Sequence, residues 1–208
     1  VRGDVWDKRF RYDITGYMLF VKDLLVIKRI SEDIFTGINA GQSFHVGLES
    51  MINWYILRGR RQGTGLHLVH SFQYSGNRFV DFVDDGTDFS GNKLPGIPDY
   101  KNDLRLRWLT GINIQTGMAW QMVGKQYLAD DNEGIYQSYQ TLDWNISYGR
   151  DLSANFGFSL SLGINNMLDQ SYASMILINA PSFGGSPPRY YYPGMPRNFY
   201  LTLQLKIG

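Results

Sequence analysis

The sequence predicts an all-β fold, an antiparallel transmembrane β-barrel, and three observations support this prediction. Apolar and polar residues alternate with a period of two over most of the chain, while helical periodicity is almost absent. The connecting segments are short at one end of the strands and long at the other, which is typical of outer-membrane barrels. Charged residues make up 19% of the 208 residues, below the roughly 25% of soluble domains, and aromatic residues reach 15%.

About eight strands are expected along the chain. Alternation is clean in 44–56, 104–108, 112–122, 141–148, 155–165 and 199–207, and less regular near 9–20 and 65–75. The last strand shows the pattern best. Its odd positions are apolar and its even positions are more polar: Phe199, Leu201, Leu203, Leu205 and Ile207 against Tyr200, Thr202, Gln204 and Lys206.

The connections between these strands fall into two length classes. Tight turns are expected near 58–63, 109–111 and 149–153, and long polar loops at 77–99, 128–138 and 167–196. In an outer-membrane barrel the short turns face the periplasm and the long loops face the exterior.

The composition of the two faces decides between a membrane barrel and a soluble one. A soluble sandwich or lipocalin-like barrel also alternates, but its outer face would carry many Lys and Glu residues. Here the polar faces are rich in Gly, Ser, Asn, Gln and Thr, and the apolar faces carry Trp and Tyr toward their ends, which favours a hydrated lumen and a lipid-facing girdle. No apolar run reaches 18 residues, so a transmembrane helix is excluded.

Charge and cysteine content exclude further classes. The formal net charge is +1, so no basic surface for nucleic acid is expected, and the absence of Cys excludes disulfides and Cys-based metal sites.

Closure of the barrel is the next question. Eight strands could close a small barrel, but the lumen of such a barrel is filled by side chains. The polar faces here are rich in Gly, Ser and Ala, which favours a wider interior and further strands before Val1. The alternative is a self-contained eight-stranded barrel that acts as a structural anchor or adhesin.

Three motifs resemble those of TonB-dependent outer-membrane receptors. The first is Asn-Ala-Gly at 39–41 followed by Gly-Leu-Glu at 47–49, and the second is Gly-Asn-Lys-Leu-Pro-Gly-Ile-Pro at 91–98. The third is Gly-Ile-Asn-Asn-Met-Leu-Asp at 163–169 with Pro-Gly-Met-Pro-Arg at 193–197. The resemblance covers nearly the whole chain.

This resemblance implies a bacterial outer-membrane protein whose barrel has about 22 strands around an N-terminal plug. Residues 1–208 would form one partial domain, the C-terminal part of that barrel, with the plug absent. Members of the family import scarce ligands such as ferric siderophores, haem or cobalamin, with energy from TonB acting on a plug segment. The implied partners are outer-membrane lipid, the N-terminal strands and plug, TonB and a small-molecule ligand. No cofactor is expected.

Turn chemistry accounts for much of the third motif. Asn165, Asn166 and Asp169 have side chains that cap turns and tolerate unusual backbone angles. Arg197, at the start of the last strand, is expected to pair with a loop carboxylate.

Catalytic and metal-binding motifs are absent, so an enzyme is not expected. The histidines are His45, His67 and His70, and the parity of His67 and His70 places them on opposite faces of a regular strand, where they cannot chelate together. An acidic stretch at 81–88 weakly suggests calcium but lacks the spacing of a known calcium loop. We therefore expect no metal site.

Charged residues within the strands are expected to face the lumen. An arginine that faces lipid costs about 2–4 kcal/mol near the midplane. We expect these residues to bind the plug or to pair within the wall; they are Glu49, Asp103, Arg105, Arg107 and Asp143.

The best candidate for ligand contact is the segment Arg189, Tyr190, Tyr191 and Tyr192, in the last long loop. Aromatic rings beside an arginine can stack on a flat ligand such as a siderophore or haem. The alternative is that these rings form part of the interfacial girdle.

Overall fold

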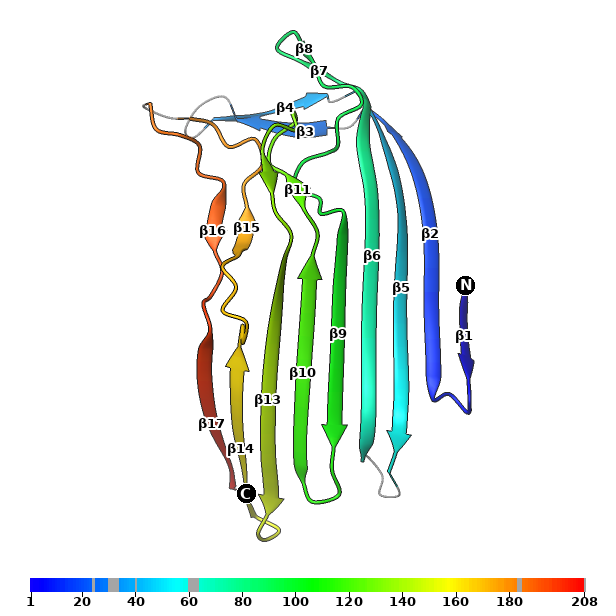
Figure 1. The fold of residues 1–208 in the computed structure, drawn as a ribbon, viewed down its shortest axis with the longest axis vertical. Helices are drawn as coiled ribbons and strands as arrows, with labels where there is room; N and C mark the ends of the chain where they lie inside the picture. The colour runs from blue at the N-terminus through cyan, green and yellow to red at the C-terminus, as the bar shows by residue number, and fades with distance from the viewer. Residues whose placement is uncertain (24, 30–33, 40, 60–63, 183–184, 208) are drawn as a thin grey trace.

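The computed structural model is a curved antiparallel sheet with loop hairpins at one end (Figure 1). It describes residues 1–23, 25–29, 34–39, 41–59, 64–182 and 185–207. The main sheet has nine strands in the order β1-β2-β5-β6-β9-β10-β13-β14-β17. Their bounds are β1 Arg2–Val5, β2 Phe10–Lys22, β5 Gln42–Arg58, β6 Gly65–Asp81, β9 Tyr100–Leu109, β10 Ile114–Val123, β13 Tyr139–Asp151, β14 Phe156–Asn165 and β17 Asn198–Ile207.

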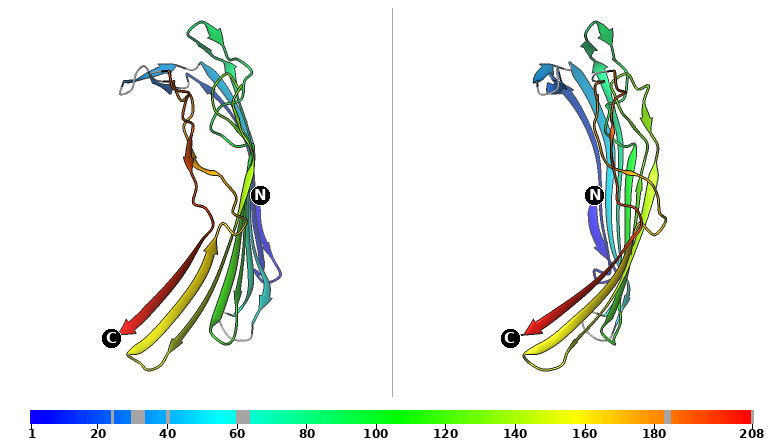
Figure 2. Two further views of the ribbon diagram at one scale, coloured as in Figure 1. Left: turned by 60° about the vertical axis from the view of Figure 1, so that its left-hand side comes forward. Right: turned by 90° about the vertical axis from the view of Figure 1, so that its left-hand side faces the viewer.

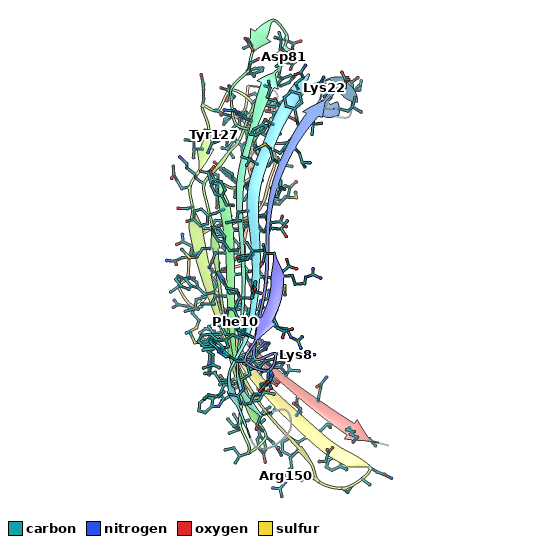
Figure 3. The ribbon with its side chains drawn as sticks, turned by 90° about the vertical axis from the view of Figure 1, so that its right-hand side faces the viewer. Lys8, Phe10, Lys22, Asp81, Tyr127 and Arg150 are labelled. Atoms are coloured by element: carbon teal, nitrogen blue, oxygen red, sulfur yellow. The ribbon has the colours of Figure 1, made fainter. Side chains whose placement is uncertain are left out.

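Four two-stranded hairpins lie in the long loops. They are β3 (Leu25–Arg29) with β4 (Phe35–Asn39), β7 (Val83–Asp84) with β8 (Thr87–Asp88), β11 (Gln126–Tyr127) with β12 (Ile135–Tyr136), and β15 (Ala173–Ile176) with β16 (Tyr191–Pro193). Figure 1 places all four at the upper end, whereas short turns join β1 to β2, β9 to β10 and β13 to β14 at the lower end. Figure 3 shows the same division, with Lys22, Asp81 and Tyr127 at the upper end and Lys8, Phe10 and Arg150 at the lower end. The predicted segregation of long and short connections is confirmed.

The predicted strands all occur, with some differences. The four-residue strand β1 was not predicted, because Arg-Gly-Asp-Val is too short to show alternation. The hairpin β3–β4 makes a fourth long loop that was also missed. The strand predicted from residue 112 begins instead at Ile114, because the Thr110 hydroxyl accepts the amide of Ile114 at 3.2 Å and holds a tight turn. The predicted turn at 58–63 lies largely outside the described residues.

The sheet is curved but not closed. Figure 2 shows that β14 and β17 bend away from the plane of the central strands. In the strand order β1 and β17 lie at opposite edges, so the described strands do not form a self-contained barrel. The sheet is a section of a wider barrel wall, as the small residues on its polar face predicted.

The register confirms the separation of the two faces. One row of directly opposed residues crosses eight strands and is entirely apolar: Phe10, Trp54, Leu68, Leu106, Met118, Trp144, Ile164 and Phe199. We call this side the apolar face. The adjacent positions form the polar face, on which a corresponding row contains Asp13, Met51, Ser71, Asp103, Gln121 and Thr141. Leu203 on the apolar face remains 60% exposed, as expected of a surface covered by lipid.

Two tryptophans on the apolar face have hydrogen-bond partners for their indole nitrogens. The indole nitrogen of Trp120 donates to Gln140 Oε1 at 3.0 Å, and that of Trp144 donates to Thr116 Oγ1, also at 3.0 Å. Thr116 Oγ1 in turn donates to the backbone carbonyl of Asn145 at 2.8 Å. Hydrocarbon offers no water to replace such partners, so this local pairing allows polar atoms to remain on a lipid-facing surface.

The described residues contain no helix that is long and apolar enough to span a membrane.

The upper end of β6 and the loop that follows it form a small hydrophobic core. Phe79 and Phe82 are each 2% exposed, and Phe89 and Leu94 pack against them. The side chain of Asn132, from the β11–β12 loop, accepts the amide of Lys93 at 2.8 Å and donates to its carbonyl at 2.9 Å. These hydrogen bonds join the two loops to each other above the sheet.

Candidate ligand-facing wall and loops

The five charged residues predicted for the lumen all lie on the polar face. Arg105 forms an ion pair with Asp103, with Nε 2.7 Å from Oδ1. Arg107 donates from Nη2 to Gln115 Oε1 at 2.8 Å. Asp143 accepts the backbone amide of Asn166 at 2.8 Å, which anchors the turn after β14. Four of the five residues thus have partners within the wall.

Glu49 differs from the other four residues. It is exposed in the middle of β5, with Gln73 opposite on β6 and Thr15 opposite on β2. Within the described part of the chain, its carboxylate has no ion pair or hydrogen bond. Glu49 is therefore the most available of the five charges for a partner inside the barrel.

The histidines do not form a shared site. The register places His67 opposite Arg107 on the polar face and His70 opposite Leu104 on the apolar face, as their parity predicted. The ring of His67 stacks on Tyr55 with a centroid distance of 4.3 Å. The Nε2 atom of His70 lies 2.6 Å from Asn102 Oδ1. Among the described residues, no three His, Asp or Glu side chains are placed to hold a metal ion, including those of the acidic stretch at 81–88.

The third motif forms the turn that was predicted from its residues. Asn166 and Asp169 have φ values of +50° and +51°, and Asn166 is only 2% exposed. The Asn166 side chain accepts the amide of Gln170 at 3.0 Å and donates to the carbonyl of Met195 at 3.1 Å. Arg197 lies 3.4 Å from Asp169 Oδ2, which confirms the predicted pair with a loop carboxylate.

The predicted ligand-contact residues lie in and next to β16, in the hairpin above β14 and β17. The ring of Tyr191 packs against Tyr136 at 5.2 Å and against Tyr190 at 6.1 Å. The ring of Tyr139, the first residue of β13, stacks on Tyr172 at 5.1 Å and meets Tyr136 edge to face at 6.1 Å. Aromatic rings therefore join the hairpin to the start of β13. The backbone amide of Ala173 donates to the Tyr136 hydroxyl at 2.6 Å, which fixes the hairpin further.

Arg189 and Tyr192 are the members of this segment whose side chains are not held by a described residue. Tyr191 and Tyr192 are 50% and 51% exposed, but Tyr192 makes no ring contact with a described residue. Arg189 is exposed and has no ion pair within the described ranges. Tyr190 and Tyr191, by contrast, contribute to the packing of the hairpin. Both interpretations of the sequence had treated the three tyrosines as equivalent.

The surroundings of Asp130 and Lys93, two charged residues in the loops, raise the pKa of each. Burial, assisted by the nearby carboxylates of Asp84 and Asp131, raises the pKa of Asp130. An opposing hydrogen bond from Asn179, 2.9 Å long, only partly offsets this effect. The hydrogen bond from Lys93 to Asp99, 2.6 Å long, raises the pKa of Lys93.

A hollow of about 440 Å³ on the polar face had no counterpart in the sequence prediction. Its polar lining is Tyr17, His45, Gln73, Ser75 and Asn77. Leu19 and Ile97 complete it, and Ile97 comes from the loop before β9. We call it the Tyr17 hollow. Only the register reveals it, because Tyr17 and Gly47, which face each other, are thirty residues apart.

Comparison with known proteins identifies the family. The family described as "TonB dependent receptor-like, beta-barrel" matches residues 1–167. No curated protein matches the sequence.

Solved structures resemble the chain over almost its whole length. The siderophore receptor PiuA from Acinetobacter baumannii has a TM-score of 0.72 at 17% identity, covering 99% of this chain and 27% of PiuA. BauA, the ferric preacinetobactin receptor of the same organism, has a TM-score of 0.70 at 15% identity, and the match covers 97% of this chain and 28% of BauA. FyuA, the ferric yersiniabactin uptake receptor from Yersinia pestis, has a TM-score of 0.69 at 18% identity, and the match covers 99% of this chain and 28% of FyuA.

At these identities the structural likeness establishes the fold alone. The chain spans a little over a quarter of the length of these receptors. The alternating strands, the segregated loops, the open curved sheet and the family match agree with one another. The chain belongs to the TonB-dependent receptor family of the bacterial outer membrane, as part of the β-barrel.

Proposed function

We propose that the chain is the C-terminal part of the barrel of a receptor that imports a scarce ligand across the bacterial outer membrane. The ligand is a ferric siderophore or another iron complex, haem or cobalamin. Residues 1–208 form one partial domain of this receptor, and the rest of the protein supplies the N-terminal strands and the plug. Energy comes from TonB, which acts on a segment of the plug.

The two-faced open sheet is the observation that carries this proposal. Its apolar face is continuous over eight strands, which suits lipid, and its polar face carries small residues such as Gly117, Gly163 and Ser161. A polar wall lined by small side chains leaves a wide lumen. Such a lumen can hold both a plug and a ligand.

The similar receptors support an iron complex among the ligand classes. PiuA is described as a siderophore receptor, and BauA and FyuA as receptors for ferric preacinetobactin and ferric yersiniabactin. In this chain we assign ligand contact to Arg189 and Tyr192, with Tyr190 and Tyr191 holding them in place. A cation beside an exposed aromatic ring suits an anionic or aromatic chelate.

We assign contact with the plug to the charged residues of the polar face. Glu49 has no partner in the described wall, and the side chain of Arg105 remains 66% exposed despite its ion pair. Both can therefore reach a domain inside the barrel without losing a buried contact. Arg107, Asp103 and Asp143 serve mainly to organise the wall.

Uptake by cells that carry the intact receptor tests this function. Deletion of its gene is expected to abolish energy-dependent uptake of one class among radiolabelled ferric siderophores, haem and cobalamin, and loss of TonB should have the same effect. Replacing Arg189 and Tyr192 with alanine should weaken ligand binding, whereas Arg150→Ala at the opposite end should not (Figure 3). Unchanged uptake of every ligand, together with loss of cell adhesion, would contradict the proposal and favour an anchor or adhesin.

A further inference from the structure

We propose that the Tyr17 hollow binds an uncharged part of the imported ligand that carries hydroxyl or amide groups. This inference rests on the proposed function, since it assumes that a ligand passes along the polar face. The site lies on the barrel wall, separate from the loop residues around Arg189.

The ring of Tyr17 lies against the sheet because the residue opposite has no side chain. Tyr17 on β2 faces Gly47 on β5, and a Cβ added at Gly47 would overlap the Tyr17 ring. The ring is therefore seated over the glycine backbone while it lines the hollow. An aromatic face held in this way can stack on a sugar ring or a planar amide.

The polar groups of the hollow include an ordered network. The Nδ1 atom of His45 lies 2.9 Å from Asn77 Oδ1, and its Nε2 atom lies 2.9 Å from Ser43 Oγ. Because Oδ1 of Asn77 only accepts, His45 donates from Nδ1, and the Ser43 hydroxyl is the partner of Nε2. Both ring nitrogens of His45 therefore have a partner. Among the described residues the side-chain nitrogen of Asn77 has no acceptor, so its donors face the hollow.

The remaining groups offer both donors and acceptors. Gln73 donates from Nε2 to Ser75 Oγ at 3.3 Å. This leaves the Ser75 hydroxyl hydrogen and the Gln73 carbonyl oxygen without a partner among the described residues. A set of amide donors, a hydroxyl donor and a carbonyl acceptor matches hydroxyl and amide groups, which donate and accept at once.

The electrostatics of the hollow favour an uncharged group. Its lining contains no Lys, Arg, Asp or Glu. The register places Glu49 on one side of Gln73 and Lys101 on the other. Beside Ser75, whose amide donates to the Asp99 carbonyl, the Asp99 carboxylate is paired with Lys93. The charges around the hollow therefore balance, and a charged ligand group would gain no net counter-charge for the water it loses there, which is costly.

The position of the hollow suits a ligand that enters from outside. His45 and Asn77 lie near the upper ends of β5 and β6, where Figure 1 shows the long loops. Ile97, from one of these loops, borders the hollow. A ligand that has passed the loops therefore meets this part of the wall early.

Binding of two matched sugars to the intact receptor in detergent tests the inference. N,N′-diacetylchitobiose carries hydroxyl and acetamide groups without charge, and digalacturonate is an anionic disaccharide of similar size. Calorimetry is expected to detect binding of the neutral sugar alone. Gly47→Ala, which displaces the Tyr17 ring, should weaken that binding about fivefold, and Tyr17→Ala by at least as much.

Gly163→Ala is the matched control, because a Cβ there would overlap the ring of Tyr200, on the polar face but at β17 and away from the hollow. This variant should leave sugar binding unchanged. Equal losses in the two glycine variants, preferential binding of digalacturonate, or no binding of either sugar would overturn the inference. The last result would mean that the hollow is filled in the receptor, for example by the plug.

Uptake distinguishes failure of the inference from failure of the proposed function. If TonB-dependent uptake is present and Gly47→Ala leaves both uptake and sugar binding unchanged, the assignment of the hollow alone is wrong. If cells with the native receptor show no TonB-dependent uptake of any ligand, the proposed function is wrong, and the inference that rests on it falls as well.

Discussion

Replacing Leu203 with arginine is expected to impair insertion of the barrel far more than the same change at the preceding residue. Leu203 lies opposite Leu160 on the apolar face, and Thr202 lies opposite Ser161 on the polar face. Each variant introduces the same charge into the same strand. Only the face differs.

The position of Leu203 determines the magnitude. It lies midway between Phe199 and Ile207, about 13 Å along the strand from either, at ~3.3 Å per residue. With a tilt of about 40° this is roughly 10 Å along the membrane normal, so Leu203 is near the centre of an apolar band about 25 Å tall. Arginine there should cost about 2–4 kcal/mol, which lowers the ratio of folded to unfolded protein about 30- to 1,000-fold. Thr202→Arg should cost less than about 1 kcal/mol, because a lumenal arginine keeps its water.

The assay is refolding of the intact receptor into phosphatidylcholine vesicles over a series of urea concentrations. The folded fraction is measured from faster migration of the unheated sample on a gel. Equal shifts of the midpoint in the two variants, or a larger shift for Thr202→Arg, would refute the assignment of the faces.

Three further substitutions test individual contacts. Gly41→Ala should destabilise the upper end of β5 by about 2 kcal/mol or more, because Gly41 has a φ of +64° and an added Cβ would overlap the carbonyl oxygen of Asp81; hydrogen exchange measures this. Asp169→Asn should cost about 0.5–1 kcal/mol in thermal unfolding, because its pair with Arg197 is about half exposed. Burial raises the pKa of Asp130, so the loop should resist protease better as pH falls from neutral toward the ordinary aspartate value, and Asp130→Asn should reduce this dependence.

Each of these predictions has a control. Gly86 has a φ of +80° but open space around it, so equal costs for Gly86→Ala and Gly41→Ala would show that overlap with the backbone is unimportant. An unchanged melting temperature in Asp169→Asn would mean that the backbone contacts of the turn suffice. The loop is expected to become more stable as pH falls because the pKa of Asp130 is raised, which means that the folded loop binds the proton more tightly than the unfolded loop does. Protease resistance that stays level or declines in the native receptor as pH falls would contradict it.

Features that depend on local pattern could be predicted from the sequence. Alternation assigns a strand to 199–207 and a face to each of its residues, because successive side chains of a strand point to opposite sides. The turn at Asn166 and Asp169 follows from the backbone preferences of these residues.

Features that depend on register could not be predicted in this way. His45 and Asn77 are hydrogen bonded although they are 32 residues apart, and nothing in either segment indicates their pairing. The seating of Tyr17 over Gly47 depends on the same register. A shift of one residue would place Tyr17 on the lipid side, so the hollow became visible only with the strands in place.

The different contacts of the tyrosines in the last long loop also depend on residues that are distant in the sequence. Tyr190, Tyr191 and Tyr192 look equivalent in the sequence. Tyr191 packs against Tyr136, more than fifty residues earlier, whereas Tyr192 has no ring contact among the described residues, although the two side chains are equally exposed.

Spin labelling of the last strand tests most directly whether one face meets lipid and the other meets water. The chain contains no cysteine, so single cysteines at each position from 199 to 207 are unique labelling sites within it. In the receptor reconstituted into vesicles, labels at odd positions should collide with oxygen dissolved in the bilayer, and labels at even positions with a water-soluble nickel chelate. The two accessibilities should alternate with a period of two and in opposite phase. Accessibilities that rise and fall together along the strand, or that show no alternation, would contradict the assignment of this sheet to a membrane barrel wall.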